Sequence, residues 1–139
     1  MRFWDSSAVI PLLITQPHSA TADTWVATDP DQAIWVVTPA EVTSALWRLT
    51  RDGTIGEDEA IDADRRVDEL AAAARTVTDV AGAVVLARRL LRVHPLRAAD
   101  ALQLGAALVW ADGRPNGLQL HTFDDRLARA ARREGFEVQ

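Results

Sequence analysis

Apolar residues in this chain fall into two patterns: short continuous runs, and longer stretches in which they recur every three or four positions. The short runs favour strands, whereas the longer stretches have the spacing of one helix face. The run from Ala33 to Val37 is continuously apolar, which is typical of a strand buried on both faces of a parallel sheet. The predicted strands are Arg2 to Asp5, Ala33 to Val37, Arg75 to Val80, Leu118 to Thr122 and Phe136 to Val138.

Helices are predicted between these strands, and turn-forming segments such as Gln16-Pro17 and Asp112 to Gly117 separate them. The alternation of strands and helices predicts an α/β fold, a three-layer α/β/α sandwich with a mainly parallel central sheet. The predicted helices are Ser6 to Leu13, Ser19 to Ala27, Thr38 to Arg51, Glu57 to Ala74, Val84 to Val93, Arg97 to Ala111 and Asp125 to Arg133.

Length and composition indicate one domain over residues 1–139, because 139 residues with 48% hydrophobic side chains suffice for a packed core. No apolar run is long enough to span a membrane, and the chain opens on Arg2-Phe3-Trp4-Asp5 without a hydrophobic leader. We therefore expect a cytoplasmic protein with no membrane partner. The absence of cysteine excludes disulfides, thiolate zinc sites and a thiol nucleophile.

The charged residues exclude or disfavour further classes of reaction. All 15 basic residues are arginine, so Schiff-base chemistry and the P-loop lysine are excluded, and a phosphatase or phosphoaspartate receiver is disfavoured. The net charge of −5 is unevenly distributed, because the segment from Arg75 to Arg97 contains five arginines and a single acid, Asp79. Three arginines of this segment are hypothetical contacts for the phosphates of a substrate: Arg88, Arg92 and Arg97.

Three acids, Asp5, Glu41 and Asp124, each follow a predicted strand. Ligands of open parallel sheets bind beyond the carboxyl ends of the strands, so these carboxylates are expected at one edge of the sheet. The alternative is that each acid only caps the helix that follows. Thr38-Pro39-Ala40-Glu41 fits a capping box, and the N-terminus of a helix favours negative charge in any case.

Asp100 is a different case, because it lies about one turn inside a largely apolar predicted helix. A buried carboxylate there needs a compensating cation, and capping is a poor explanation for it. An exposed ion pair with Arg97 is the second interpretation. Together the four acids predict a carboxylate site for a hard divalent metal.

Four segments of the chain resemble the PIN-domain ribonucleases, and specifically the VapC toxins of bacterial toxin-antitoxin pairs. They are Phe3-Trp4-Asp5-Ser6-Ser7-Ala8, Pro39-Ala40-Glu41, His94 to Leu104 with its Arg97-Ala98-Ala99-Asp100-Ala101-Leu102 core, and Thr122-Phe123-Asp124-Asp125-Arg126-Leu127. The resemblance spans nearly the whole chain.

The resemblance implies that Asp5, Glu41, Asp100 and Asp124 are catalytic and bind Mg²⁺ or Mn²⁺, with Ser6, Thr122 and Asp125 as possible outer-shell residues. It also implies an RNA substrate, a homodimer and a cognate antitoxin protein. The expected reaction is hydrolysis by metal-activated water, which leaves a 5′-phosphate and a 3′-hydroxyl. The alternative hypothesis is a non-catalytic PIN-fold module that binds protein or RNA and whose acids only cap helices.

Overall fold

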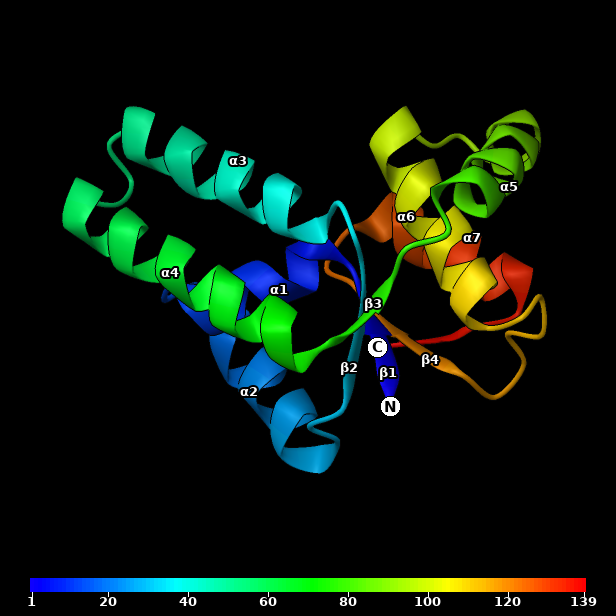
Figure 1. Ribbon diagram of the computed structural model, residues 1–139, viewed down its shortest axis with the longest axis horizontal. Helices are drawn as coiled ribbons and strands as arrows, with labels where there is room; N and C mark the ends of the chain where they lie inside the picture. Colours follow the sequence, from blue (N-terminus) through cyan, green and yellow to red (C-terminus); the bar gives the residue numbers. More distant parts are fainter.

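A computed structural model describes all 139 residues, which form five strands and seven helices (Figure 1). The strands are β1 (Arg2–Trp4), β2 (Gln32–Trp35), β3 (Arg75–Val77), β4 (Gln119–His121) and β5 (Glu137–Val138). The helices are α1 (Ser6–Leu13), α2 (Ser19–Thr28), α3 (Thr38–Arg51), α4 (Glu57–Ala73), α5 (Val80–Val93), α6 (Ala98–Trp110) and α7 (Asp125–Glu134).

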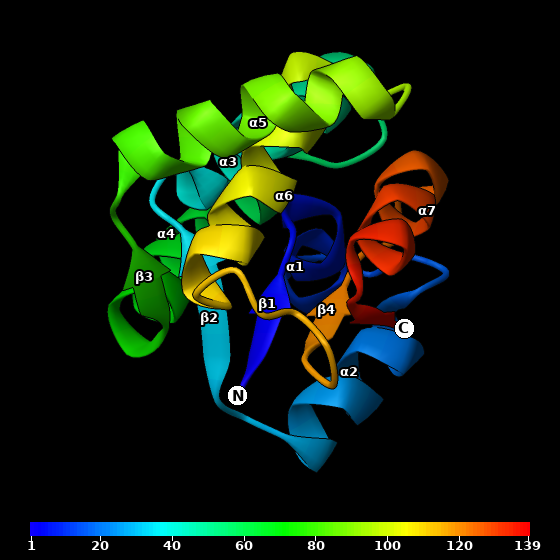
Figure 2. The same ribbon diagram turned by 90° about the vertical axis from the view of Figure 1, so that its right-hand side faces the viewer.

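The five strands form one sheet in the order β3-β2-β1-β4-β5, and every neighbouring pair is parallel. Helices α1 to α4 cover one face and α5 to α7 cover the other, as the two perpendicular views show (Figures 1 and 2). The predicted three-layer α/β/α sandwich is therefore confirmed. Parallel pairing also brings the carboxyl ends of β1, β2 and β4 to one edge of the sheet, where the segments carrying the acids begin.

Alternation of side chains along the strands builds two separate cores. Phe3 and Trp35 pack against α5, α6 and α7, whereas Trp4 and Ile34 pack against α1 to α4. Successive residues of a strand point to opposite faces, so each short strand contributes to both cores. None of the seven helices has the combination of length and apolar character that crossing a membrane requires.

All five strands are shorter than their predicted ranges, and β2 and β3 show the physical reason. Val36 and Val37 lie in a turn after β2 and are 40% and 37% exposed, so the apolar run from Ala33 to Val37 does not end as a strand. Helix α5 begins at Val80, four residues before its predicted start, because the Asp79 side chain accepts a hydrogen bond of 2.8 Å from the Gly82 amide. That cap ends the preceding extended segment, and β3 stops at Val77.

Candidate active site

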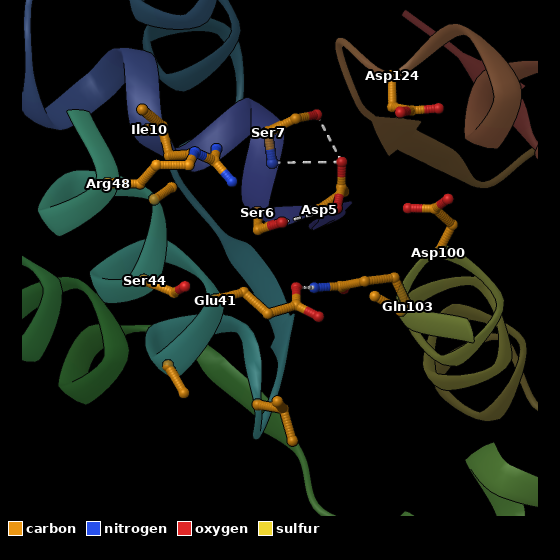
Figure 3. Close-up of a pocket in the computed structure, with 14 residues that line it drawn as sticks. Asp5, Ser6, Ser7, Ile10, Glu41, Ser44, Arg48, Asp100, Gln103 and Asp124 are labelled. Atoms are coloured by element: carbon orange, nitrogen blue, oxygen red, sulfur yellow. Dashed lines mark hydrogen bonds between the residues drawn. The ribbon is translucent and has the colours of Figure 1, made fainter. Parts of the chain in front are cut away.

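All four predicted acids line one cavity of about 470 Å³ at the carboxyl edge of the sheet. In Figure 3, Glu41 approaches from α3, Asp100 from α6, and Asp124 from the segment after β4, while Asp5 lies between them at the end of β1. The residues are far apart in sequence, and the parallel sheet together with the starts of α1, α3, α6 and α7 brings them together.

Asp5 is the most buried of the four acids, with 4% of its surface exposed. It is the N-cap of α1, as the capping alternative predicts, and its carboxylate accepts hydrogen bonds from the Ser7 amide (3.3 Å) and the Ser6 hydroxyl (3.2 Å). The Ser7 hydroxyl also donates to it, and the Thr122 hydroxyl donates a fourth bond of 2.7 Å from the end of β4. These donors fix the orientation of the carboxylate, so Asp5 has little freedom to turn away from the cavity.

Glu41 lies in the first turn of α3 but does not cap it. The N-cap is Val37, no side chain caps the helix, and the Thr38 hydroxyl instead accepts hydrogen bonds from the Trp35 amide (3.2 Å) and the Gln103 side chain (3.1 Å). The capping-box interpretation of Thr38 to Glu41 is therefore wrong. The side-chain amide of Gln103 also donates to the Glu41 carboxylate, which holds Glu41 at the cavity.

Asp100 is half-buried, and the expectation that capping does not involve it is wrong. Helix α6 begins at Ala98, so Asp100 lies within its first turn, and the Arg97 amide donates a 3.3 Å hydrogen bond to its Oδ2 atom. The charged groups of Arg97 and Asp100 do not form an ion pair. All five ion pairs of the chain involve other residues. The Oδ1 atom of Asp100 accepts no hydrogen bond.

Asp124 is the N-cap of α7, as the capping interpretation predicts. Its Oδ1 atom accepts hydrogen bonds of 2.8 Å from the amides of both Arg126 and Leu127. Its Oδ2 atom accepts none, so one oxygen fixes the helix start and the other remains available to a ligand. Capping and ligand binding are therefore compatible at this residue.

Burial raises the pKa of three of the four carboxylates, and repulsion between neighbouring acids adds to the rise at Glu41 and Asp100. Burial raises the pKa of Asp5, although hydrogen bonds from Ser7, Thr122 and Ser6 oppose the rise. Burial also raises the pKa of Glu41 against the hydrogen bond from Gln103, and the charges of Asp5 and Asp100 add to the increase. The pKa of Asp100 is raised by burial, and the charge of Asp124 contributes. A cation in this cavity would relieve the repulsion and favour the ionised forms.

The donor set fits a hard divalent cation, because carboxylate oxygens are the ligands that Mg²⁺ and Mn²⁺ prefer. Asp100 and Asp124 line the cavity, and each has one carboxylate oxygen that accepts no hydrogen bond. No arginine forms an ion pair with any of the four acids. No three His, Cys, Asp or Glu side chains converge closely enough to form a ready-made metal cluster. Binding of an ion would therefore draw the four carboxylates closer together.

The three predicted outer-shell residues occupy different positions. Ser6 lines the cavity and donates to Asp5. Thr122 also donates to Asp5, but it does not line the cavity and is almost fully buried. Asp125 is exposed, and it lines a neighbouring cavity rather than the acidic one. Direct or water-mediated contact of these residues with a metal stays a prediction.

Of the predicted phosphate contacts, Arg97 lines the neighbouring cavity next to Asp100 and Asp124. Arg88 and Arg92 are exposed on α5 and line neither cavity. The sequence interpretation missed Arg48 of α3, which lines the acidic cavity, and Arg126 and Arg129 of α7, which line the neighbouring one. A usable signal existed for Arg126, because it follows the Asp124-Asp125 pair at the start of a helix.

The fold and the cavity define an α/β protein with a carboxylate-lined site at the carboxyl ends of a parallel sheet. The chain belongs to the PIN domain family, which it matches over residues 2–133. It is 36% identical to both Ribonuclease VapC45 and Ribonuclease VapC49 of Mycobacterium tuberculosis, over 137 residues that make up 98% of this chain and 92% of each relative. The resemblance seen in the sequence motifs is thus confirmed.

The fold is also similar to the crystal structure of Mycobacterium tuberculosis VapC20, which is described as a Sarcin-Ricin loop cleaving toxin. The TM-score is 0.68 at 19% sequence identity, and the match covers 94% of this chain and 95% of that chain. At this identity the comparison concerns the fold alone.

Proposed function

We propose that this chain is the endoribonuclease toxin of a toxin-antitoxin pair and that it hydrolyses RNA phosphodiester bonds with the help of Mg²⁺ or Mn²⁺. The observation that carries the proposal is the meeting of Asp5, Glu41, Asp100 and Asp124 in one cavity. Similarity to VapC ribonucleases over 98% of the chain supports the same reaction.

In this proposal the four carboxylates hold the ion. When bound there, a divalent ion lowers the pKa of a water molecule and stabilises negative charge on the phosphate oxygens. The chain's own contribution is to hold the carboxylates in place: Ser7 and Thr122 orient Asp5, Gln103 holds Glu41, and the first turn of α7 fixes Asp124. Because these contacts exist without substrate, the carboxylates would need little further reorganisation once an ion is bound.

The scissile phosphate would lie in the acidic cavity, with water as the nucleophile. Attack by water on phosphorus breaks the bond to the 3′-oxygen, which leaves as the 3′-hydroxyl and takes a proton, while the other fragment carries a 5′-phosphate. This outcome excludes a role for the ribose 2′-hydroxyl as nucleophile, so the chemistry of the RNA ends tests the mechanism.

Two protein partners complete the proposal: a cognate antitoxin and a second copy of the chain. Similarity to VapC proteins supports the antitoxin. Helix α5 supports self-association, because Val80, Val84 and Leu91 recur on one side of the helix and are 47%, 39% and 42% exposed. Light scattering after size-exclusion chromatography tests the homodimer directly.

The alternative, a PIN-fold module that binds protein or RNA without cleaving it, derives support from one observation. Asp5, Asp100 and Asp124 all accept hydrogen bonds from the backbone at helix starts, so capping alone accounts for part of their placement. It does not account for Glu41, whose carboxylate caps no helix. We therefore favour the nuclease.

The test is cleavage of a cellular RNA pool in the presence of Mg²⁺ or Mn²⁺, followed by sequencing of the new ends. We expect 5′-phosphate and 3′-hydroxyl ends from the wild-type chain and none from Asp100→Asn. The side-chain oxygen of the asparagine can still accept the hydrogen bond from the Arg97 backbone amide. Asp58→Asn is the matched control, because Asp58 also lies in the first turn of a helix but is exposed on α4. Equal cleavage by the wild type and Asp100→Asn would refute the assignment.

A further inference from the structure

A groove extends from the acidic cavity across the starts of two helices. A second cavity of about 430 Å³ shares Asp100 and Asp124 with the acidic one. A third cavity, of about 90 Å³, shares Arg126 and Arg129 with the second. Shared lining residues place the three hollows side by side, and this row of hollows, here called the groove, leads from the acids along α7.

Arginines dominate the far part of this groove. Arg97 lines the second cavity from the start of α6, Arg126 and Arg129 line it from α7, and Arg133 continues the row in the third cavity. The three α7 arginines are spaced by three and four positions, which places them on one side of the helix. Leu127 and Ala131 of the same helix are buried in the core, so the arginine side faces outward.

These four guanidinium groups have no partners within the protein. None of them takes part in an ion pair or a side-chain hydrogen bond, whereas Arg89 pairs with Glu134 and Arg65 pairs with Glu69. A ligand can therefore engage all of them without breaking an existing bond. The starts of α6 and α7 flank the second cavity and add the partial positive charge of two helix N-termini.

We infer that Arg97, Arg126 and Arg129 bind the backbone phosphates of the RNA strand next to the scissile phosphate and that Arg133 extends this contact. The inference rests on the proposed function, and it assigns the substrate path to α7. A guanidinium group matches two phosphate oxygens at once, and a row of such groups beside the catalytic carboxylates suits a polyanion. Metal bound by Asp100 and Asp124 would remove their repulsion of the strand.

The same reasoning separates this row from the other unpaired arginines. Arg51, at the end of α3, and Arg114, in the loop after α6, are exposed and line none of the three cavities. The double variant Arg51→Ala/Arg114→Ala therefore removes the same charge as Arg126→Ala/Arg129→Ala from a different surface. It is the matched control for a nonspecific effect of net charge.

The first arm of the test is steady-state cleavage of an RNA substrate. Loss of phosphate contacts that form in both the ground state and the transition state raises KM while kcat changes little. We expect Arg126→Ala/Arg129→Ala to raise KM at least about tenfold with kcat within about threefold of the wild type, as the loss of two charge-assisted contacts implies. The control pair should keep the wild-type KM, and an unchanged KM in the α7 pair would overturn the inference.

The second arm measures binding without cleavage, in an Asp5→Asn background. A short fluorescent single-stranded RNA is titrated at several salt concentrations, and each lost phosphate contact reduces the slope of log K against log salt by about 0.7. We expect a reduction of about 1.4 in the α7 pair and none in the control pair. Circular dichroism checks the fold, and the single variants Arg126→Ala and Arg129→Ala each repeat the measurement.

The two arms separate the inference from the function on which it rests. If the wild-type chain cleaves no RNA but binds it through the α7 arginines, the nuclease proposal is wrong, while the inference that these arginines bind RNA is confirmed. If it cleaves RNA with no dependence on these arginines, the inference about the arginines is wrong and the nuclease proposal is unaffected. Polyglutamate serves as an acidic-peptide probe, and binding of polyglutamate with the same arginine dependence in the absence of RNA binding would also overturn the inference.

Discussion

The hydroxyl of Thr122, at the end of β4, donates a hydrogen bond of 2.7 Å to the carboxylate of Asp5, at the end of β1. The same oxygen accepts a 3.0 Å hydrogen bond from the Asp124 amide. One side chain thus links two of the four acids across a pair of parallel strands. The sheet aligns the strand ends, and Thr122 orients the Asp5 carboxylate and holds the backbone of Asp124 next to it.

Replacement of Thr122 by valine keeps the shape of the side chain and removes both hydrogen bonds. Asp5 then loses a donor and the Asp124 amide loses an acceptor, so we expect unfolding to require about 1–3 kcal/mol less free energy. Urea denaturation measures this change. Thr122→Ser retains the hydroxyl and should recover most of the loss, and a fully stable Thr122→Val variant would contradict the role of this contact.

Gln103 performs the equivalent task for Glu41, because its buried amide donates to both Glu41 and Thr38. Gln103→Leu removes the contact that holds Glu41 at the cavity. Loss of an outer-shell partner commonly costs 10–100-fold in metal affinity or activity, so we expect a drop of about that size in cleavage rate. Gln103→Glu should be at least as harmful, since a fifth carboxylate would repel Glu41, and wild-type rates in both variants would exclude this role.

His121 predicts a pH dependence of stability. Its ring stacks on Trp25 with centroids 4.2 Å apart and is fully buried, and burial with the nearby charge of Arg2 lowers its pKa to about 4. The unfolded chain binds this proton below its ordinary pKa of 6.5, whereas the folded chain does not until about 4. Stability therefore falls as the pH drops through this window, by on the order of 3 kcal/mol.

The control for this prediction is His121→Phe, which keeps an aromatic ring against Trp25 and cannot be protonated. Other groups also change protonation as the pH falls, so the contribution of His121 is measured as the difference between the two stability curves. We expect the wild type to lose more stability than His121→Phe between pH 6.5 and pH 4. Parallel curves from chemical denaturation at each pH would rule out a buried neutral histidine.

Gly105 allows α5 and α6 to pack closely. A Cβ atom at this position would lie 2.5 Å from the backbone oxygen of Ala83, and backbone cannot move aside as a flexible side chain can. Gly105→Ala should therefore destabilise the fold by about 1–3 kcal/mol, more than the roughly 1 kcal/mol that alanine gains in helix propensity. Gly56→Ala, with open space around the added Cβ, is the matched control in a thermal melt.

The element order and the parallel sheet could be predicted because both depend on apolar periodicity, which can be read from the sequence alone. Element ends were less predictable. The apolar pair Val36-Val37 continues the pattern of β2, yet the chain turns there before α3 begins at Thr38. The cap at Asp79, which fixes the start of α5, was equally difficult to predict, because Asp79 lies in the segment from Arg75 to Val80 that has a strand-like pattern.

The four acids were predictable because three of them follow strands and the fourth interrupts an apolar helix. Their hydrogen-bond partners were not. Gln103 lies 62 positions from Glu41 and Thr122 lies 117 positions from Asp5, so no local pattern links either pair. The burial of Asp100 was overestimated, since a residue in the first turn of a helix at the sheet edge keeps contact with solvent.

Calorimetric titration of Mn²⁺ into the chain tests most directly the claim that Asp5, Glu41, Asp100 and Asp124 form one cation site. We expect saturable, stoichiometric binding to the wild type and to Asp58→Asn, and affinity lowered at least about tenfold in Asp100→Asn and in Glu41→Gln, which lies in a different helix. Glu41 is decisive because it caps no helix. Absence of saturable heat in the wild type, or identical binding in Glu41→Gln, would contradict a shared metal site.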